Sequence, residues 1–213
     1  MFTMALFPVL SRQAQDDQQG FLRFYSLGTK ILLLIALPAA IISTIAAREM
    51  VLILGGPEYL PDAMVALQFM AWSIPIGWIN SLTQYVLIAL DQQRYLIRAY
   101  LIGFGFSLIT NLLLMARFGY RASAILHIFA EAALLIPFVI GLKCQLGHID
   151  WWGIVGKLLL SAAIAGLVAL VLLPVGRWGA LLGAMLAYPL AVWRFNVLTP
   201  DEWGLLAPLL RKK

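Results

Sequence analysis

Long uncharged runs alternate with short charged segments along the whole chain. Six runs stand out, at 31–47, 63–90, 99–116, 122–142 with Glu131 as its one charge, 158–176 and 178–193. Most match the roughly 17 to 25 residues that a helix needs to cross about 30 Å of hydrocarbon. The pattern predicts an all-α integral membrane protein with six complete transmembrane helices.

We expect the spans near 22–48, 63–90, 96–116, 121–142, 155–175 and 178–195. Residues 1–11 are also uncharged but too short to span, and the Phe7-Pro8 step is typical of the exit of a helix. We therefore expect the chain to begin at the end of a seventh span, as a fragment or as a product that lacks its front half. Its organisation would be a helical lobe over 1–142, then a final helix pair and a basic tail over 143–213.

The composition agrees with a membrane protein. Hydrophobic residues make up 62% of the chain and charged residues 12%, and the mean hydropathy is +0.91. An ordinary soluble domain carries about twice that charged fraction.

The connections leave no room for a separate soluble catalytic domain. The chain also lacks the residue patterns of a metal cluster, a phosphate-binding loop or a nucleophile with its base. We expect no enzyme, no cofactor and no metal.

The lysines and arginines are unevenly divided between alternate connections. Eleven fall in the segments 12–30, 91–98 and 143–157, at Arg194 and in the C-terminal tail, and four fall in the other connections. Positively charged loops tend to remain in the cytoplasm. The count predicts a multi-pass protein of the cell inner (cytoplasmic) membrane with a cytoplasmic C-terminus. The net charge of +5 is explained by this topology, so we expect membrane lipids and no nucleic acid as partners.

The second predicted span is irregular. Its 28 residues would measure about 42 Å as one helix, and Pro75 and Gly77 lie near its centre. Proline removes a backbone donor and clashes with the preceding turn, so we predict a kink there. Asn80 and Gln84 follow on one helical face. Such amides join neighbouring helices or line a substrate cavity.

Glu131 and His127 are spaced i, i+4 in the fourth predicted span, so they share a helical face. A carboxylate at bilayer depth is costly unless it faces protein or a hydrated cavity. The pair is a candidate for binding a proton or cation, or for hydrogen bonding to sugar hydroxyls. The alternative is a structural contact with a neighbouring helix, for example with Asn111.

Arg23 and Lys30 are seven residues apart and lie on nearly the same face of the first predicted helix. Cationic groups at a cytoplasmic mouth can receive a phosphate or pyrophosphate headgroup, for which Arg has the better geometry. The alternative is ordinary anchoring of the helix at the membrane surface.

The order of several short motifs resembles the later half of the polysaccharide-biosynthesis flippases, in the multidrug/oligosaccharidyl-lipid/polysaccharide exporter superfamily. The motifs are LFPVLSR at 6–12, LGGPEY at 54–59, ALDQQR at 89–94, NLLL at 111–114 and GYRASA at 119–124. The family pattern after Gly119 usually has another glycine and two alanines, where this chain has Ala122 and Ser123. His127 stands where a small hydroxyl residue is more usual.

The resemblance implies a protein of about 12 to 14 helices in two six-helix lobes around a central cavity. The present spans would be helices nine to fourteen, so the partners would include a missing N-terminal lobe. The implied activity is alternating-access flipping of an undecaprenyl-pyrophosphate-linked glycan for cell-surface polysaccharide synthesis. The alternatives are a multidrug/ion antiporter of the same superfamily and a flippase for a lipid II-type peptidoglycan precursor.

Overall fold

The computed structural model describes residues 18–147, 149–199 and 202 of the chain. The described part is helical and contains no strand, so the predicted all-α class is confirmed. Its elements are α2 (Gln18–Ile45), α3 (Ala47–Leu54), the 3-10 turn η1 (Pro57–Tyr59), α4 (Asp62–Met70), α5 (Ser73–Ala89), α6 (Gln93–Leu146), the π-helical turn η2 (Trp152–Gly156), α7 (Lys157–Leu172) and α8 (Arg177–Arg194). The expected partial span at 1–11 and the basic tail lie outside the described residues.

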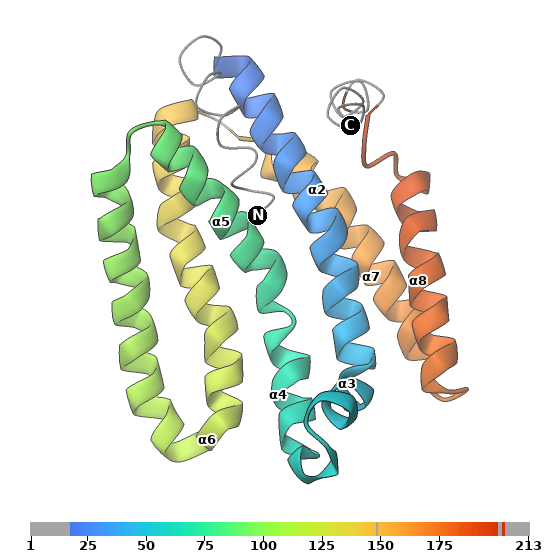
Figure 1. Ribbon diagram of the computed structural model, residues 1–213. Coiled ribbons are helices and arrows are strands. Elements are labelled where there is room, and N and C mark those ends of the chain that lie inside the picture. Colours follow the sequence, from blue (N-terminus) through green and yellow to red (C-terminus); the bar gives the residue numbers. More distant parts are fainter. Residues whose placement is uncertain (1–17, 148, 200–201, 203–213) are drawn as a thin grey trace.

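Helix α6 is a hairpin of two helical arms rather than one rod (Figure 1). The chain reverses at Gly119, whose φ of 64° and ψ of −156° are not helical. A positive φ is readily reached by glycine because it has no Cβ. The two arms contain the span-length segments Gln93–Met115 and Arg117–Leu146, close to the expected spans at 96–116 and 121–142.

The second predicted span is broken into α4 and α5, whose axes differ by 41°. We expected a kink near Pro75 and Gly77, and the break lies one turn earlier, around Ala71. The reason is that a proline ring clashes with the carbonyl four residues before it, which for Pro75 belongs to Ala71. The Ser73 hydroxyl donates to the Met70 carbonyl at 2.7 Å and so satisfies one of the freed acceptors.

The helices form an elongated bundle in which α2 lies between the α5–α6 group and the α7–α8 hairpin (Figure 1). The largest core cluster joins α2 to this hairpin, and Leu33, Leu37 and Leu158 belong to it. A second cluster joins α2 to α5 and to the end of α6. The hydroxyls of Tyr25 and Thr83 share a buried hydrogen bond of 2.8 Å between α2 and α5. Apolar packing supplemented by interhelical hydrogen bonds is typical of membrane bundles.

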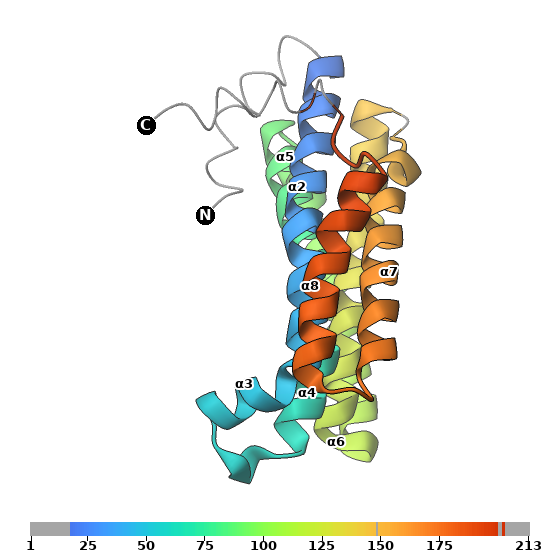
Figure 2. The ribbon, with the colours of Figure 1, turned by 90° about the vertical axis from the view of Figure 1, so that its right-hand side faces the viewer.

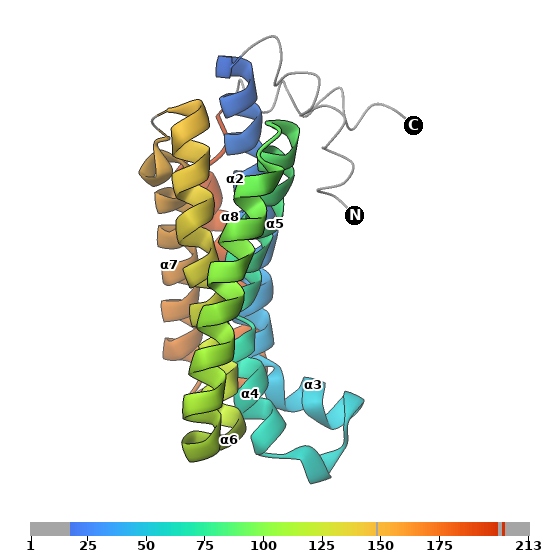
Figure 3. The same cartoon turned by 90° about the vertical axis from the view of Figure 1, so that its left-hand side faces the viewer.

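Helix α3 leaves the bundle and projects sideways from one end of it (Figures 2 and 3). We expected the first span to continue to residue 48, but α2 stops at Ile45 and the chain turns at Ala46. Ile53 and Leu54, near the end of α3, are each 82% exposed. An exposed apolar segment at a bundle end is typical of a helix that lies at a membrane interface.

Four helical segments are long and apolar enough to cross a membrane, or five if the bent pair α4 and α5 is one span. The expectation of six complete spans is therefore not confirmed. Besides the bent pair, the predicted span outside this count is α8, which has 18 residues with Arg177 and Arg194 at its ends. It would extend about 27 Å, slightly less than the hydrocarbon thickness.

Lysines and arginines gather mainly at one end of the bundle. Of the eleven in the described residues, seven lie at the end where α2 begins: Arg23, Lys30, Arg94, Arg98, Lys143, Lys157 and Arg194. The other four, at the end where α2 stops, are Arg48, Arg117, Arg121 and Arg177. The cytoplasmic location of the first group stays a prediction.

Candidate functional site

Glu131 lies in the second arm of α6 and contacts α5. The Asn80 side-chain amide donates to Glu131 Oε2 at 2.7 Å and to the Glu131 carbonyl at 2.9 Å. Asn80 is 4% exposed, and Glu131 is partly buried. A Cβ added at Gly77, one turn before Asn80, would lie 3.5 Å from Glu131 Oε2. The irregular start of α5 thus brings a small residue and an amide against the carboxylate.

The charge of Glu131 has no cationic partner among the described residues. Both hydrogens of the Asn80 amide are directed to Glu131, and Asn80 Oδ1 is buried with no hydrogen-bond partner in the described part of the chain. A buried polar atom without a partner is costly. Asn80 Oδ1 and the Glu131 carboxylate are both acceptors, so together they can bind a proton, a cation or a substrate hydroxyl.

Gln84 lies one turn beyond Asn80 on α5. Its Oε1 accepts a hydrogen bond of 2.7 Å from the Tyr100 hydroxyl of the first α6 arm. Tyr100 is 40% exposed, and its ring packs edge-on against Phe138 with 5.5 Å between the ring centroids. Tyr100 was not among the predicted residues. Its role depends on how the two arms pack, which no short motif records.

Neither His127 nor Asn111 forms a hydrogen bond with the Glu131 carboxylate in the described part of the chain. His127 is exposed and forms no hydrogen bond to Glu131, although both lie on the same arm. The Asn111 amide donates to the Ser107 carbonyl of its own arm at 2.9 Å. The suggested contact between Glu131 and Asn111 is therefore wrong, because Asn80 occupies that position. A one-turn sequence spacing places two residues on a face but does not bring their polar atoms together.

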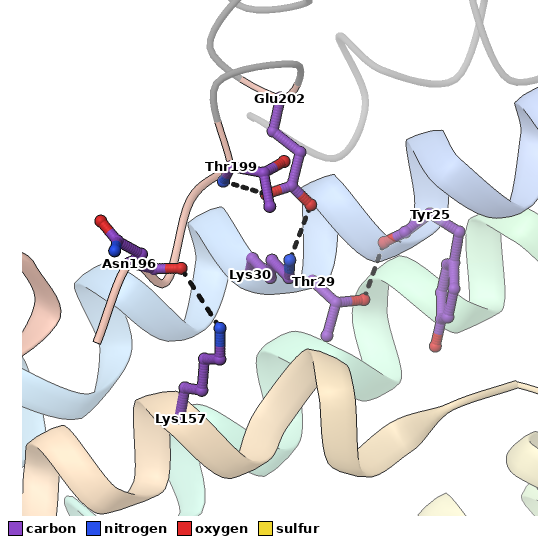
Figure 4. Close-up of polar contacts among 7 residues, drawn as sticks. All are labelled: Tyr25, Thr29, Lys30, Lys157, Asn196, Thr199 and Glu202. Carbon is purple, nitrogen blue, oxygen red and sulfur yellow. Dashed lines mark hydrogen bonds and ion pairs between the residues drawn. The ribbon is translucent and has the colours of Figure 1, made fainter.

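Arg23 and Lys30 line one cavity of about 670 Å³ at the end where α2 begins. This agrees with the expectation that they share a face of the first helix. The cavity also contains Asp150 and Glu202. Lys30 Nζ lies 2.6 Å from Glu202 Oε1, and the two side chains are only 11% and 18% exposed (Figure 4). The positive charge of Lys30 is thus already paired within the protein.

Glu202 was missed by the sequence analysis and closes this ion pair from beyond α8. Its other oxygen accepts a hydrogen bond of 2.8 Å from the Thr199 backbone N–H (Figure 4). Burial raises the pKa of a carboxyl, but the bonds from Lys30 and Thr199 outweigh it. The pKa of Glu202 therefore lies below its ordinary value of 4.5. Arg23 is exposed in the same cavity and forms no ion pair with the described residues.

No group of three or more His, Cys, Asp or Glu side chains able to hold a metal is found within residues 18–147, 149–199 and 202. The single cysteine, Cys144, is exposed. No family model matches the chain, and no curated protein matches it.

Proposed function

We propose that this protein flips a lipid-linked oligosaccharide across the cell membrane by alternating access, together with further membrane helices that complete a central cavity. The observation that carries the proposal is a polar face on α5 and on the two span-length arms of α6. The face contains the Asn80–Glu131 pair, the hydrogen bond between Gln84 and Tyr100, and the exposed imidazole of His127.

The location of these groups favours a hydrated cavity over lipid. Tyr100 is 40% exposed and His127 is also exposed, although both belong to segments long enough to span a membrane. Ionisable and hydrogen-bonding groups that face hydrocarbon are expensive, and in membrane proteins they usually face protein or water. Amide, phenol, imidazole and carboxylate groups together can exchange hydrogen bonds with sugar hydroxyls.

The division of charge supports the proposed direction of transport. In the proposal, the end with seven described cations faces the cytoplasm, and the membrane is the inner membrane. The proposal also counts six membrane spans, among them α8 and the bent α4–α5 pair as one span. A pyrophosphate headgroup would approach Arg23 at this mouth, while Lys30 remains bound to Glu202. The lipid tail would stay in the bilayer. A polar pathway lowers the cost of moving sugars through hydrocarbon, and no bond is broken.

Cell-surface glycan export tests the proposal directly. In cells that express the protein from its own gene, Glu131→Gln should reduce surface glycan and accumulate its lipid-linked precursor at unchanged protein levels. Glu58→Gln, an exposed carboxylate in η1, is the matched control and should export normally. Full glycan export after deletion of the gene would contradict the proposed function. Full glycan export by Glu131→Gln would show that Glu131 has no part in the mechanism.

Thiol labelling tests the cavity independently of the substrate. In a Cys144→Ser background, His127→Cys should react rapidly with a water-soluble maleimide because a thiolate forms only where water enters. Leu113→Cys, on the first α6 arm, is a suitable control because Leu113 is 65% exposed and apolar. Equal, slow labelling of both cysteines would show that His127 faces lipid.

A multidrug/ion antiporter of the same superfamily is the second candidate function. The uncompensated carboxylate of Glu131 favours it, since coupling to an ion gradient needs a group that binds a proton or cation. A lipid II-type precursor flippase would use the same cavity. Precursor analysis separates these possibilities: a glycan flippase accumulates lipid-linked surface oligosaccharide when inactive, a lipid II flippase accumulates peptidoglycan precursor, and an antiporter accumulates neither.

A further inference from the structure

A second cavity lies near the end of the bundle where α2 stops, away from the polar face of α5 and α6. It is a groove of about 310 Å³ between α2, α4 and α7. α2 contributes Ile41 and Ile45, α4 contributes Met64, and α7 contributes Leu170 and Leu173. These side chains give the groove a mainly apolar surface that suits a hydrocarbon ligand.

Gly166 of α7 also lines the groove. A Cβ added there would meet no atom within 4 Å, so the absence of a side chain is not required by a neighbouring helix. Gly183 of α8 differs, since a Cβ there would overlap the Leu172 side chain. Glycine inside a helix lowers stability relative to alanine. Gly166 therefore leaves open space beside the groove at a cost to the fold.

Two arginines, Arg48 and Arg177, lie at the rim of the groove. Arg48 is exposed and forms no ion pair with any described residue. Arg177 lies 3.2 Å from Glu49 Oε1. Two guanidinium groups against one carboxylate leave one net positive charge at the mouth of an apolar groove. Guanidinium groups bind phosphate well because their N–H groups match its oxygens.

The surrounding side chains place this rim at the level of lipid headgroups. Trp178 follows Arg177 and is 71% exposed, and Trp72 at the groove is 41% exposed. Tryptophan is enriched at the membrane–water boundary. The projecting helix α3, with its exposed Ile53, lies at the same end (Figure 2).

We infer that this groove is a binding site for an anionic phospholipid, with an acyl chain along α7 past Gly166 and the headgroup phosphate at Arg48 and Arg177. An apolar channel with a cationic mouth matches both parts of such a lipid. A free phosphate would leave the apolar surface uncovered. The inference does not depend on the proposed function.

Lipid titration of the purified full chain in neutral detergent, followed by native mass spectrometry, tests the site. The probes are phosphatidylglycerol, phosphatidylcholine with the same acyl chains, and glycerol phosphate as the headgroup alone. We expect phosphatidylglycerol to bind about tenfold more tightly than phosphatidylcholine, as for a charge-assisted contact at a partly exposed site. Glycerol phosphate should not bind measurably.

Three variants and two matched controls locate the binding. Arg48→Gln should remove most of the preference for the anionic lipid, whereas Arg117→Gln, at the same end of the bundle but outside the groove, should keep it. Gly166→Phe should weaken the binding of both lipids because its side chain fills the open space, and Gly166→Ala should leave the binding of both lipids unchanged. If Gly166→Phe does not fold, Leu170→Phe is the second way to narrow the groove.

The expected pattern supports the site. Three results would overturn the proposed lipid site. The wild type could bind both lipids with equal affinity, or Arg48→Gln could keep the wild-type preference for phosphatidylglycerol. Lipid binding could also be unchanged when the groove is filled. Binding of glycerol phosphate as tight as that of the lipid would show a simple anion site instead.

Discussion

The side-chain amide of Asn80 holds Glu131 across 51 positions of sequence, with Nδ2 2.7 Å from Oε2 and 2.9 Å from the backbone carbonyl. The pair joins α5 to the second arm of α6. Because both amide hydrogens are used on one side, Asn80 Oδ1 remains without a partner in the described structure. The contact is therefore both a link between helices and a place where a ligand can add a hydrogen bond.

Asn80→Leu should destabilise the protein by about 1–3 kcal/mol, because it leaves a partly buried carboxylate without its donor. The measurement is reversible unfolding in mixed micelles. Asn111→Leu is the matched control, since among the described residues that amide bonds only to Ser107 of its own arm. The double variant Asn80→Leu/Glu131→Leu should recover stability, because no unpaired polar group then remains. Equal losses in Asn80→Leu and Asn111→Leu would contradict the structural role of the pair.

The helices could be predicted because the length of an uncharged run reports the length of a span directly. The reversal at Gly119 also lies within a short charged connection that the sequence marks clearly. The turn after Ile45 could not be predicted, because nothing charged interrupts the apolar run until Arg48. Where a helix leaves a bundle depends on which neighbours cover it, and that is not recorded in local hydropathy.

The site residues were only partly predictable for a related reason. Asn80 and Glu131 stand out individually as polar groups within apolar runs, but their pairing depends on the rotation of two helices about their axes. Tyr100 and Glu202 carry no such signal. The first is one aromatic residue among many, and the second is one of two adjacent acidic residues after the last span, where acidic residues are ordinary.

Gly141→Ala should destabilise the α6 hairpin by about 1–3 kcal/mol, as overpacking does in a filled core. A Cβ at Gly141 would overlap the Tyr95 ring, and the Tyr95 hydroxyl also donates to the Pro137 carbonyl at 2.6 Å. Moving the ring would strain this bond between the arms. Gly105→Ala is the control, because a Cβ there meets no atom within 4 Å. Thermal unfolding in detergent measures both, and a loss in Gly105→Ala equal to that in Gly141→Ala would contradict the packing argument.

The Lys30–Glu202 pair should make the stability of the folded protein depend on pH in the acid range. The pKa of Glu202 is lowered in the folded protein from 4.5, so the folded state holds this proton less tightly than the unfolded state. Its contribution is present above about pH 5 and is lost as the pH falls through the folded-state pKa. We expect Glu202→Gln to cost up to about 1 kcal/mol at pH 7, and the difference from wild type to shrink below pH 4.5.

Lys30→Gln should give the same loss at pH 7, and the double variant should lose no more than either single change. Unfolding temperatures between pH 3.5 and 7 provide the measurement. A difference between wild type and Glu202→Gln that grows as the pH falls would have the wrong sign for a lowered pKa.

The orientation of the bundle is open to a direct test through Cys144, which is exposed and lies at the end with seven described cations. A membrane-impermeant maleimide should not label it in intact spheroplasts and should label it once the membrane is permeabilised. Arg121→Cys in a Cys144→Ser background lies at the opposite end and should react in intact spheroplasts. The reverse pattern would place Arg23 at the outer mouth of the cavity. A lipid-linked pyrophosphate could then not meet it on entry from the cytoplasmic leaflet, and the proposed direction of flipping would fail.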